Sequence, residues 1–440
     1  MISITHNTND KYQGWDAYAM DNQLIKIHVI PSLGGRIIQL EMDGNNYLFV
    51  NNLLKGKEPG PTGLSETGSW LNFGGEKIWP APQGWDLSNQ WPGPPDPILD
   101  SGIYSVIDEN NHTGENKLKL ISPYDNYTGL QIAKEIVLSE TRSEVSICAT
   151  FYNKSTVLKS WSIWPVIQVN TPDLNMEDRY QIVCPINSKS DFEKGYKVMH
   201  GIANNPQNGL DSYGNMVINY KYIVAKVGLD ANSNWLAFMD KVTGKVFLLL
   251  FTHEEDQFYP ENTSIQVWTQ GRGIIYSRNK IVEYANDLVI NPPYIEMELL
   301  SPLKEIPPGE SMRFEYRMLT CTIAKYTEIK SVNNIAVIAT SLRLQTGIEG
   351  LLVIGQYGVF SNGTIRLQFK DKKNNLIQSP GFKFEKSVSP FEEVILEVNI
   401  SRVMWLIDQD LTAMLTLDLF DQDNKYIGEL DQVRLDQRPS

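Results

Sequence analysis

Residues 68–104 read GSWLNFGGEKIWPAPQGWDLSNQWPGPPDPILDSGIY, and the rest of the chain is interpreted outward from them. The stretch holds four tryptophans, six prolines and, after Gly68, five further glycines. Proline lacks the backbone donor that a helix interior or a central strand needs, so neither element is predicted here. So much tryptophan also argues against a disordered linker. We expect a long ordered loop, which either forms the wall of a binding cleft or caps a sheet with tryptophans as packing plugs.

Composition limits the partners that the protein can have. The 440 residues carry a net charge of −13, which argues against a nucleic-acid surface and against an anionic membrane as partner. The N-terminus lacks the pattern of a signal peptide, and no apolar run reaches the ~18 residues of a membrane span. Three widely spaced cysteines fit free thiols in a reducing compartment, so a cytoplasmic location is predicted. The oligomeric state stays open.

Short alternating runs of apolar and polar residues dominate, whereas helical periodicity is scarce, which predicts an all-β protein. More than a dozen strands before residue 323 exceed what one flat sheet holds, so a large two-layer sandwich is expected. One of these strands, 160–170, contains Pro165 and is predicted to lie at an edge or to carry a bulge. From about residue 330 the pattern restarts as seven short strands, the size of an immunoglobulin-like sandwich. The predicted domains are 1–328 and an accessory 329–440.

Four pieces of residues 20–325 resemble the galactose mutarotase-like superfamily, the large antiparallel β-supersandwich of the aldose 1-epimerases. They are PSLGGRII at 31–38, GGEKIWPAP at 74–82, residues 259–271 with IQVWT at 265–269, and YIEMELLSP at 294–302. The second piece looks like the Gly-Gly-x-Lys-x-Trp-Pro-Ala-Pro signature of a bacterial branch of that superfamily. The resemblance implies that residues 1–328 bind a sugar or an oligosaccharide.

The resemblance also implies catalytic residues. Epimerases carry their catalytic base on the strand that matches 294–302, where this chain has Glu296 and Glu298. Side chains alternate along a strand, so these two carboxylates share one face, and mutual repulsion would raise the pKa of one of them. The epimerase strand with the acid histidine resembles residues 161–166, which hold no histidine. His253 is the candidate substitute, and Lys77 stands where epimerases have an arginine that contacts the sugar.

Aromatic rings can cover the C–H faces of a sugar while polar groups bond its hydroxyls. The predicted substrate contacts are Trp70, Asn72, Glu76, Lys77, Trp79, Gln83, Trp85, Trp91 and Trp268. The chain has no phosphate-binding glycine loop, nucleophile elbow or zinc spacing, so no cofactor and no metal are expected.

Whether the protein is an enzyme stays open. If it is active, we expect an aldose 1-epimerase-like isomerase that interconverts sugar anomers by general acid and base catalysis. The alternatives are a catalytically silent sugar-binding or sensing protein and a glycoside hydrolase or polysaccharide lyase. A hydrolase would use a carboxylate pair such as Glu76 and Glu298.

Overall fold

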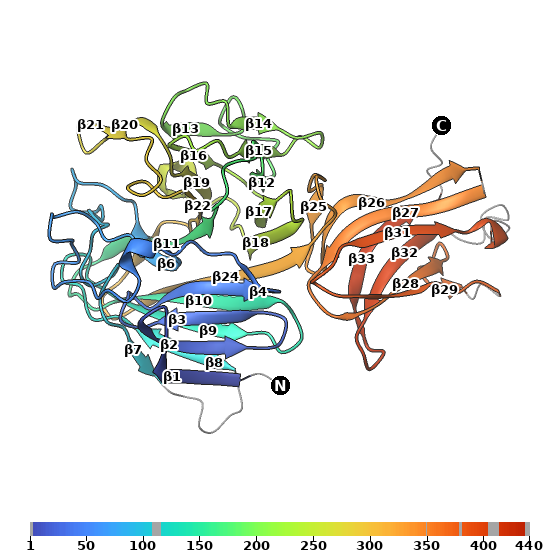
Figure 1. Ribbon diagram of the computed structural model, residues 1–440, viewed down its shortest axis with the longest axis horizontal. Coiled ribbons are helices and arrows are strands. Elements are labelled where there is room, and N and C mark those ends of the chain that lie inside the picture. The colour runs from blue at the N-terminus through green and yellow to red at the C-terminus, as the bar shows by residue number, and fades with distance from the viewer. Residues whose placement is uncertain (1–2, 108–115, 349, 378–380, 404–412, 436–440) are drawn as a thin grey trace. The chain divides into compact units, whose positions relative to one another are not determined.

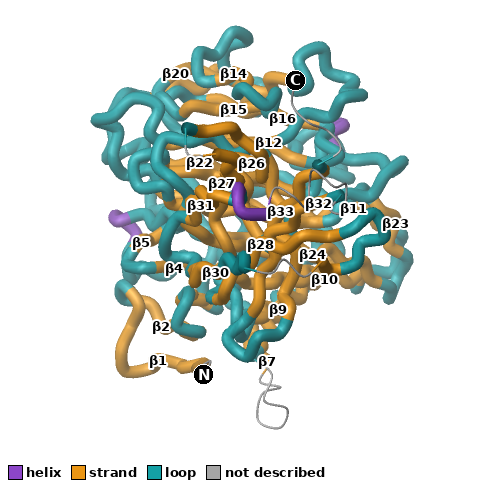
Figure 2. Tube along the Cα trace, turned by 90° about the vertical axis from the view of Figure 1, so that its right-hand side faces the viewer, coloured by secondary structure: helices purple, strands orange, loops and turns teal. Residues whose placement is uncertain are grey.

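The computed structural model describes residues 3–107, 116–348, 350–377, 381–403 and 413–435. It is built from antiparallel strands with three short 3-10 turns, η1 (Asn52–Leu54), η2 (Pro260–Asn262) and η3 (Ser401–Val403). Figure 2 shows how far strands and loops outweigh helical turns. The predicted all-β class is therefore confirmed.

Two large sheets form the N-terminal part of the fold (Figure 1). The first runs in the order β1 (Ser3–Tyr12), β2 (Trp15–Asp21), β3 (Lys26–Ile30), β4 (Arg36–Met42), β6 (Glu76–Ala81), β11 (Lys159–Asn170), β22 (Tyr294–Leu299), β19 (Ile265–Thr269), β16 (Ala225–Leu229) and β13 (Lys197–His200), with β5 (Asn45–Asn46) beside β4 and β23 (Lys304–Ile306) beside β11. The second runs β14 (Asn208–Leu210), β15 (Met216–Asn219), β12 (Tyr180–Cys184), β17 (Trp235–Asp240), β18 (Lys245–Phe251), β24 (Ser311–Thr322), β10 (Glu144–Asn153), β9 (Leu130–Leu138), β8 (Lys117–Ile121) and β7 (Ser105–Ile107). A separate hairpin pairs β20 (Gly273–Ser277) with β21 (Lys280–Tyr284).

Alternation along the strands explains why the two sheets pack against each other. In β24, Met312, Phe314 and Tyr316 are buried while the residues between them are exposed. This period of two gives the sheet one apolar side that must be covered and one side that faces water. The apolar sides of the two sheets form the interior of the sandwich, as the sequence predicted.

The sandwich interior also contains a charged cluster. Glu76 of β6 accepts hydrogen bonds from the Lys134 ammonium of β9 and the Tyr316 hydroxyl of β24, and Lys134 also donates to the Gly35 carbonyl at 3.1 Å. All three side chains are fully buried, or nearly so. Burial lowers the pKa of Lys134 against the opposing effect of Glu76, and it raises the pKa of Tyr316 well above its ordinary value. The cluster joins the two sheets through one carboxylate.

Two proline predictions are wrong. Residues 76–81 form the central strand β6, although the stretch was expected to be a loop, and Pro80 pairs with Ile163 of β11. The described pairing between β6 and β4 is limited to Glu76 and Ile37. Pro80 therefore has no described partner on the β4 side, and its missing N–H costs no hydrogen bond there. Pro165 likewise lies in the central strand β11. On this side, β11 pairs with β23 up to Trp161 and with β22 from Val166 onward. Pro165, which has no backbone N–H, therefore lies in the gap between these two ladders.

The two glycines before β6 allow it to enter the sheet. Gly74 and Gly75 have φ of +98° and +75°, in the left-handed region that favours glycine. A Cβ on Gly74 would lie 2.0 Å from the Phe49 carbonyl oxygen, and one on Gly75 would lie 2.6 Å from that of Ile37. The Gly-Gly pair therefore sets the position of the lysine that follows in β6.

Residue contacts divide the chain into two compact units. Unit 1 is Met1–Glu140, Glu144–Phe238 and Leu248–Leu319, and unit 2 is Thr141–Ser143, Met239–Phe247 and Thr320–Ser440. Unit 2 thus includes two internal segments besides the C-terminal region that the sequence assigned to 329–440. An independent accessory domain at 329–440 stays a prediction.

The C-terminal region of unit 2 is a smaller β-sandwich around its own apolar core. One sheet is β25 (Ser331–Val332), β26 (Ala336–Gly347), β27 (Gly350–Val359) and β31 (Val394–Asn399). The other is β29 (Leu376–Ile377), β28 (Gly363–Lys370), β32 (Met414–Phe420) and β33 (Tyr426–Arg434), with β30 (Glu385–Val388) beside β28. Residues 378–380 follow β29 and lie outside the described ranges.

Candidate functional site

The side of the first sheet that faces away from the second sheet carries charged residues on adjacent strands. Val166 of β11 lies opposite both Lys77 of β6 and Glu298 of β22, so Lys77 and Glu298 share a face. Glu296 lies opposite Trp268 of β19, which in turn lies opposite Lys226 of β16. We call this surface the site face. Its members are Lys77, Trp79, Trp164, Gln168, Lys226, Trp268, Glu296 and Glu298.

Each glutamate of the site face is held by a lysine and a second donor. The Glu298 Oε2 atom accepts bonds of 2.8 Å from the Lys226 Nζ and the Trp164 Nε1. The Glu296 Oε1 atom accepts a 2.7 Å bond from the Gln168 amide and lies 3.5 Å from the Lys77 Nζ. The two carboxylates predicted to share one face therefore do so, and each lies beside an ammonium group.

Burial shifts the protonation of this cluster. The side chain of Glu298 is 0% exposed, that of Lys77 is 2% exposed and that of Glu296 is 12% exposed. Burial raises the pKa of Glu298, and the Glu296 charge raises it further, while Lys226 opposes both. Burial lowers the pKa of Lys77 to about 8, against the pull of Glu296. The site face thus combines a carboxyl group with a raised pKa, Glu298, and an amine with a lowered pKa, Lys77.

Three polar atoms of the site face have no hydrogen-bond partner within the described chain. They are the Lys77 Nζ, the Glu298 Oε1 and the Gln168 Oε1. Buried polar atoms are normally bonded, so such atoms need an explanation, and a catalytic role is one of the recognised explanations. One of the three is a donor and two are acceptors when Glu298 is ionised, so a group that both donates and accepts would satisfy them.

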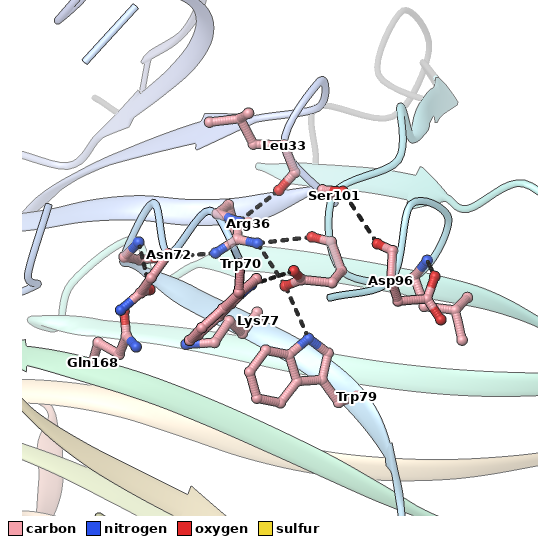
Figure 3. Close-up of polar contacts among 12 residues, drawn as sticks. Leu33, Arg36, Trp70, Asn72, Lys77, Trp79, Asp96, Ser101 and Gln168 are labelled. Carbon is pink, nitrogen blue, oxygen red and sulfur yellow. Dashed lines mark hydrogen bonds and ion pairs between the residues drawn. The ribbon is translucent and has the colours of Figure 1, made fainter. Parts of the chain in front are cut away.

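Tryptophans surround the charges. The Lys77 Nζ lies 4.8 Å from the ring centroid of Trp79, and the Lys226 Nζ lies at the same distance from Trp164. The Trp79 ring packs edge-on against Trp164 at 5.4 Å and against Trp70 at 6.0 Å. In the view of Figure 3, Trp70 and Arg36 lie above Lys77, and Trp79 lies below it to the right.

Asp100 anchors this aromatic group. Its carboxylate accepts bonds from the indole N–H groups of Trp70 at 2.7 Å and Trp79 at 3.2 Å, and it pairs with Arg36 at 2.9 Å. Arg36 also donates to the carbonyls of Leu33 and Gly74 (Figure 3). Asp100 and Arg36 are buried and paired with each other. Asp100 therefore holds the two indole rings, and Arg36 is not free to bind an anionic ligand.

A family model described as "Domain of unknown function (DUF4380)" matches residues 16–319. The chain belongs to this family. The match covers β2 to most of β24, and so every residue of the site face of this DUF4380 protein. No curated protein matches the chain in sequence.

Several solved structures resemble the DUF4380 chain in fold. The Slr1438 protein from Synechocystis sp. PCC 6803 is 12% identical with a TM-score of 0.44, over 73% of this chain and 100% of that one. A galactose mutarotase-like protein from Lactobacillus casei is 11% identical with a TM-score of 0.44, over 69% and 99%. A galactose mutarotase related enzyme from Lactobacillus acidophilus is 11% identical with a TM-score of 0.41, over 70% and 97%. The last two carry the name of the superfamily that the sequence pieces resemble.

Five predicted substrate contacts lie elsewhere in the DUF4380 fold. The prediction for Glu76 is wrong, because its carboxylate is buried between the sheets on the side opposite to Lys77. Trp91 is fully buried and donates to Asp96, and Gln83 donates to the Gly93 carbonyl, so both stabilise the loop internally. Asn72, which precedes β6, accepts from the Gly74 N–H, and Trp85, in the loop after β6, is 41% exposed.

The structure brings His200, and not His253, to the border of the site face. The His253 ring stacks on Tyr259 at 5.1 Å, and its backbone N–H bonds to Asn234. None of its described contacts involves Glu296 or Glu298. His200 of β13 lies beside Lys226 in the sheet, and its ring meets that of Trp268 at 6.2 Å.

Sequence reasoning missed Lys226, Trp164 and Gln168. Lys226 lies 72 residues from Glu298 in the chain, in a strand whose other residues are apolar or small. Trp164 and Gln168 alternate along β11 with side chains that face the interior. The sequence predicts this alternation, but it does not predict which strands lie on either side of β22.

Two hollows of about 280 and 240 Å³ lie on the water-facing side of the second sheet. Both include Glu135 and Cys148, which share this side with Arg313 and Arg317. The described ion pairs there, such as Lys117–Glu135 at 2.7 Å, are typical of a solvated sheet surface. The described helices include none that is long and apolar enough to cross a membrane.

The lowered pKa of Lys77 predicts a pH dependence of stability. Its ordinary pKa is 10.5 and its folded value is about 8, so between these values the unfolded chain binds more protons than the folded one. The contribution of this group to stability therefore rises with pH across that window. In urea unfolding, the free energy of unfolding of the wild type, taken relative to that of Lys77→Met, should rise from pH 8 to pH 10. A constant difference would contradict the lowered pKa.

Proposed function

We propose that the site face binds a sugar. The observation that carries this proposal is that one face of the sheet holds three buried polar atoms without a hydrogen bond: the Lys77 Nζ, which lies 3.5 Å from Glu296, the Glu298 Oε1 and the Gln168 Oε1. A sugar hydroxyl donates one hydrogen bond and accepts others, so neighbouring hydroxyls can satisfy an ammonium group and carboxylate or amide oxygens together. A monatomic ion could satisfy one kind of atom only.

The aromatic residues supply the other half of sugar recognition. Trp268 is half-buried beside Glu296, and Trp79 lies beside Lys77. A ring placed next to polar groups can cover the C–H face of a sugar while its hydroxyls reach the charges. This combination supports a carbohydrate more than an amphipathic lipid or a peptide.

We further propose that the bound sugar undergoes proton transfer at its anomeric centre. An ionised carboxylate of the pair Glu296 and Glu298 would take the proton of the anomeric hydroxyl, and the Lys77 ammonium would donate a proton to the ring oxygen, which opens the ring. After rotation about the C1–C2 bond of the open-chain aldehyde, the reverse transfers close the ring on the other face of C1 and restore both the carboxylate and the Lys77 ammonium. The resemblance to epimerases supports a glutamate of this strand as the base.

A catalytically silent sugar-binding protein is the second candidate, because the acid histidine of the epimerases has no equivalent on the site face. A hydrolase that uses Glu76 and Glu298 is not proposed, since these carboxylates lie on opposite faces of the first sheet. The three cysteines are free in the structure, which supports the cytoplasm as the proposed compartment.

Proton NMR against aldoses, uronic acids and short oligosaccharides tests both steps in one sample. Saturation transfer reports binding, and exchange between anomer signals reports turnover. We expect Trp268→Ala to weaken sugar binding about tenfold or more, because it removes a ring of the site face. Phe258→Ala is the control, since Phe258 is an exposed aromatic residue of unit 1 outside this face. Absence of binding to the whole panel would reject the proposed function.

A further inference from the structure

The hairpin of β20 and β21 belongs to neither large sheet. It leaves the first sheet after β19 and returns to it before β22, so it begins beside the two strands that carry Trp268, Glu296 and Glu298. Its turn residues Arg278 and Asn279 have φ of +52° and +57°, the geometry of a tight two-residue hairpin turn. The Arg278 side chain is therefore presented at the tip.

The base of the hairpin contacts the site face. The Tyr284 ring packs edge-on against Trp268 at 6.2 Å. Burial raises the pKa of Tyr284, and the Glu296 charge adds to this effect. On the other strand of the hairpin, the backbone of Tyr276 is bonded to the His200 side chain.

The tip of the hairpin contacts the opposite border of the site face. Arg278 donates a 2.8 Å hydrogen bond to the Pro94 carbonyl, and its guanidinium lies 4.5 Å from the ring centroid of Trp85. Both partners belong to the loop that follows β6. The hairpin is thus anchored beside β19 at one end and beside the β6 loop at the other.

These two anchors place the hairpin across the site face. Strands β11 and β22 lie between β6 and β19 in the first sheet. A hairpin that starts after β19 and contacts the loop after β6 therefore lies over these two strands. A cover of this kind explains why Lys77 and Glu298 are buried although they point away from the sandwich interior.

The hairpin has few contacts that would keep it closed. A two-stranded ribbon is marginally stable by itself. Ile275 is its one fully buried hydrophobic side chain, whereas Ile274, Tyr276 and Ile281 are exposed. Segments with few buried apolar contacts open at low free-energy cost. The Arg278 contacts are then a large part of what holds the tip.

We propose that the β20–β21 hairpin is a lid that opens to admit a ligand and closes over it, with Arg278 as its latch. A closed lid encloses the ligand, so the site takes a saccharide of one or two rings and not an internal segment of a polysaccharide. The substrate class rests on the proposed sugar-binding function, but the lid itself does not.

The lid is tested without any ligand, through the accessibility of Lys77. Reductive methylation with formaldehyde and a borane reductant, read by peptide mass spectrometry, gives the rate at which the Lys77 amine reacts. We expect Arg278→Ala, and separately Trp85→Ala, to raise this rate about fivefold or more, because either change weakens the latch. Lys280→Ala removes a cation from the same hairpin without touching the latch, and should leave the rate unchanged. Equal rates in wild type and both latch variants would overturn the lid.

The substrate class is tested separately by saturation transfer with a monosaccharide, the matching disaccharide and the hexasaccharide of the same sugar. We expect the wild type to bind the first two and to exclude the hexasaccharide, and Arg278→Ala to release the monosaccharide faster. Hexasaccharide binding as tight as monosaccharide binding would overturn the size limit. Faster Lys77 methylation in the latch variants with no binding of any saccharide would keep the lid and reject the sugar.

Discussion

Replacement of Lys134 by alanine is expected to lower the free energy of unfolding of unit 1 by about 3–5 kcal/mol. The Glu76 carboxylate lies between the two sheets and is fully buried. Without Lys134, its remaining described side-chain partner is the Tyr316 hydroxyl. A buried charge that loses its counter-ion keeps its desolvation cost, so the loss far exceeds that of a surface ion pair.

Tryptophan fluorescence during urea unfolding measures this loss, because every tryptophan except Trp405 belongs to unit 1. The matched control is Glu135→Ala. Glu135 is the next residue of β9 and points to the water-facing side, where it pairs with Lys117 at 2.7 Å. Its removal should cost under about 1 kcal/mol. If the two variants lost the same stability, the interior cluster would not hold the sheets together.

A second variant separates the charge from the packing. Lys134→Met combined with Glu76→Gln removes both charges and keeps most of the side-chain volume. Replacement of a buried ion pair by neutral groups of similar volume is often close to neutral. We therefore expect the double variant to be more stable than Lys134→Ala. A double variant as unstable as Lys134→Ala would contradict the unpaired charge as the cause of the loss.

The sequence predicted the sandwich because alternation is a local signal. Residues 311–322 read SMRFEYRMLTCT, and the first half of this run places apolar and polar residues on opposite sides of β24. The same rule put Glu296 and Glu298 on one face of β22, as the structure has them. Two-residue spacing is fixed by backbone geometry and needs no knowledge of neighbouring strands.

Strand order is not local, and the errors follow from that. Pro80 suggested a loop, but β6 is central because the ladder with β4 ends before that proline is reached. Glu76 and Lys77 are adjacent in sequence, yet one faces the interior and the other the site face. The choice between these faces depended on β9 and β24, which supply Lys134 and Tyr316 from far along the chain.

The same limit applies to the partners of the glutamates. Lys226 reaches Glu298 because β16 follows β19 in the sheet, and His200 comes next on β13. His253, the candidate substitute for the acid histidine, follows β18, which belongs to the second sheet. The face of a residue can be derived from its own strand, whereas its partners require the order of all the strands.

Replacement of Glu298 by glutamine is expected to reduce anomeric exchange by about 100-fold or more, and to weaken sugar binding by much less, since the Oε1 acceptor is lost as well. The substitution fits the observed contacts. The Glu298 Oε2 atom accepts from both Lys226 and Trp164, and an amide oxygen in its place can accept the same two bonds. The amide nitrogen would take the position of Oε1, which has no partner in the described chain. The fold should therefore tolerate the change while the carboxylate is lost.

Glu305→Gln is the control, since Glu305 is exposed on β23, and it should exchange anomers at the wild-type rate. Glu296→Gln distinguishes the roles within the pair. If exchange falls in Glu298→Gln and less in Glu296→Gln, then Glu298 is the base and Glu296 modulates its pKa. If exchange survives in both variants, the glutamate pair does not perform the proton transfer. If the wild type binds sugar without any exchange, the same contacts describe a silent binder, and Glu298→Gln should then alter affinity alone.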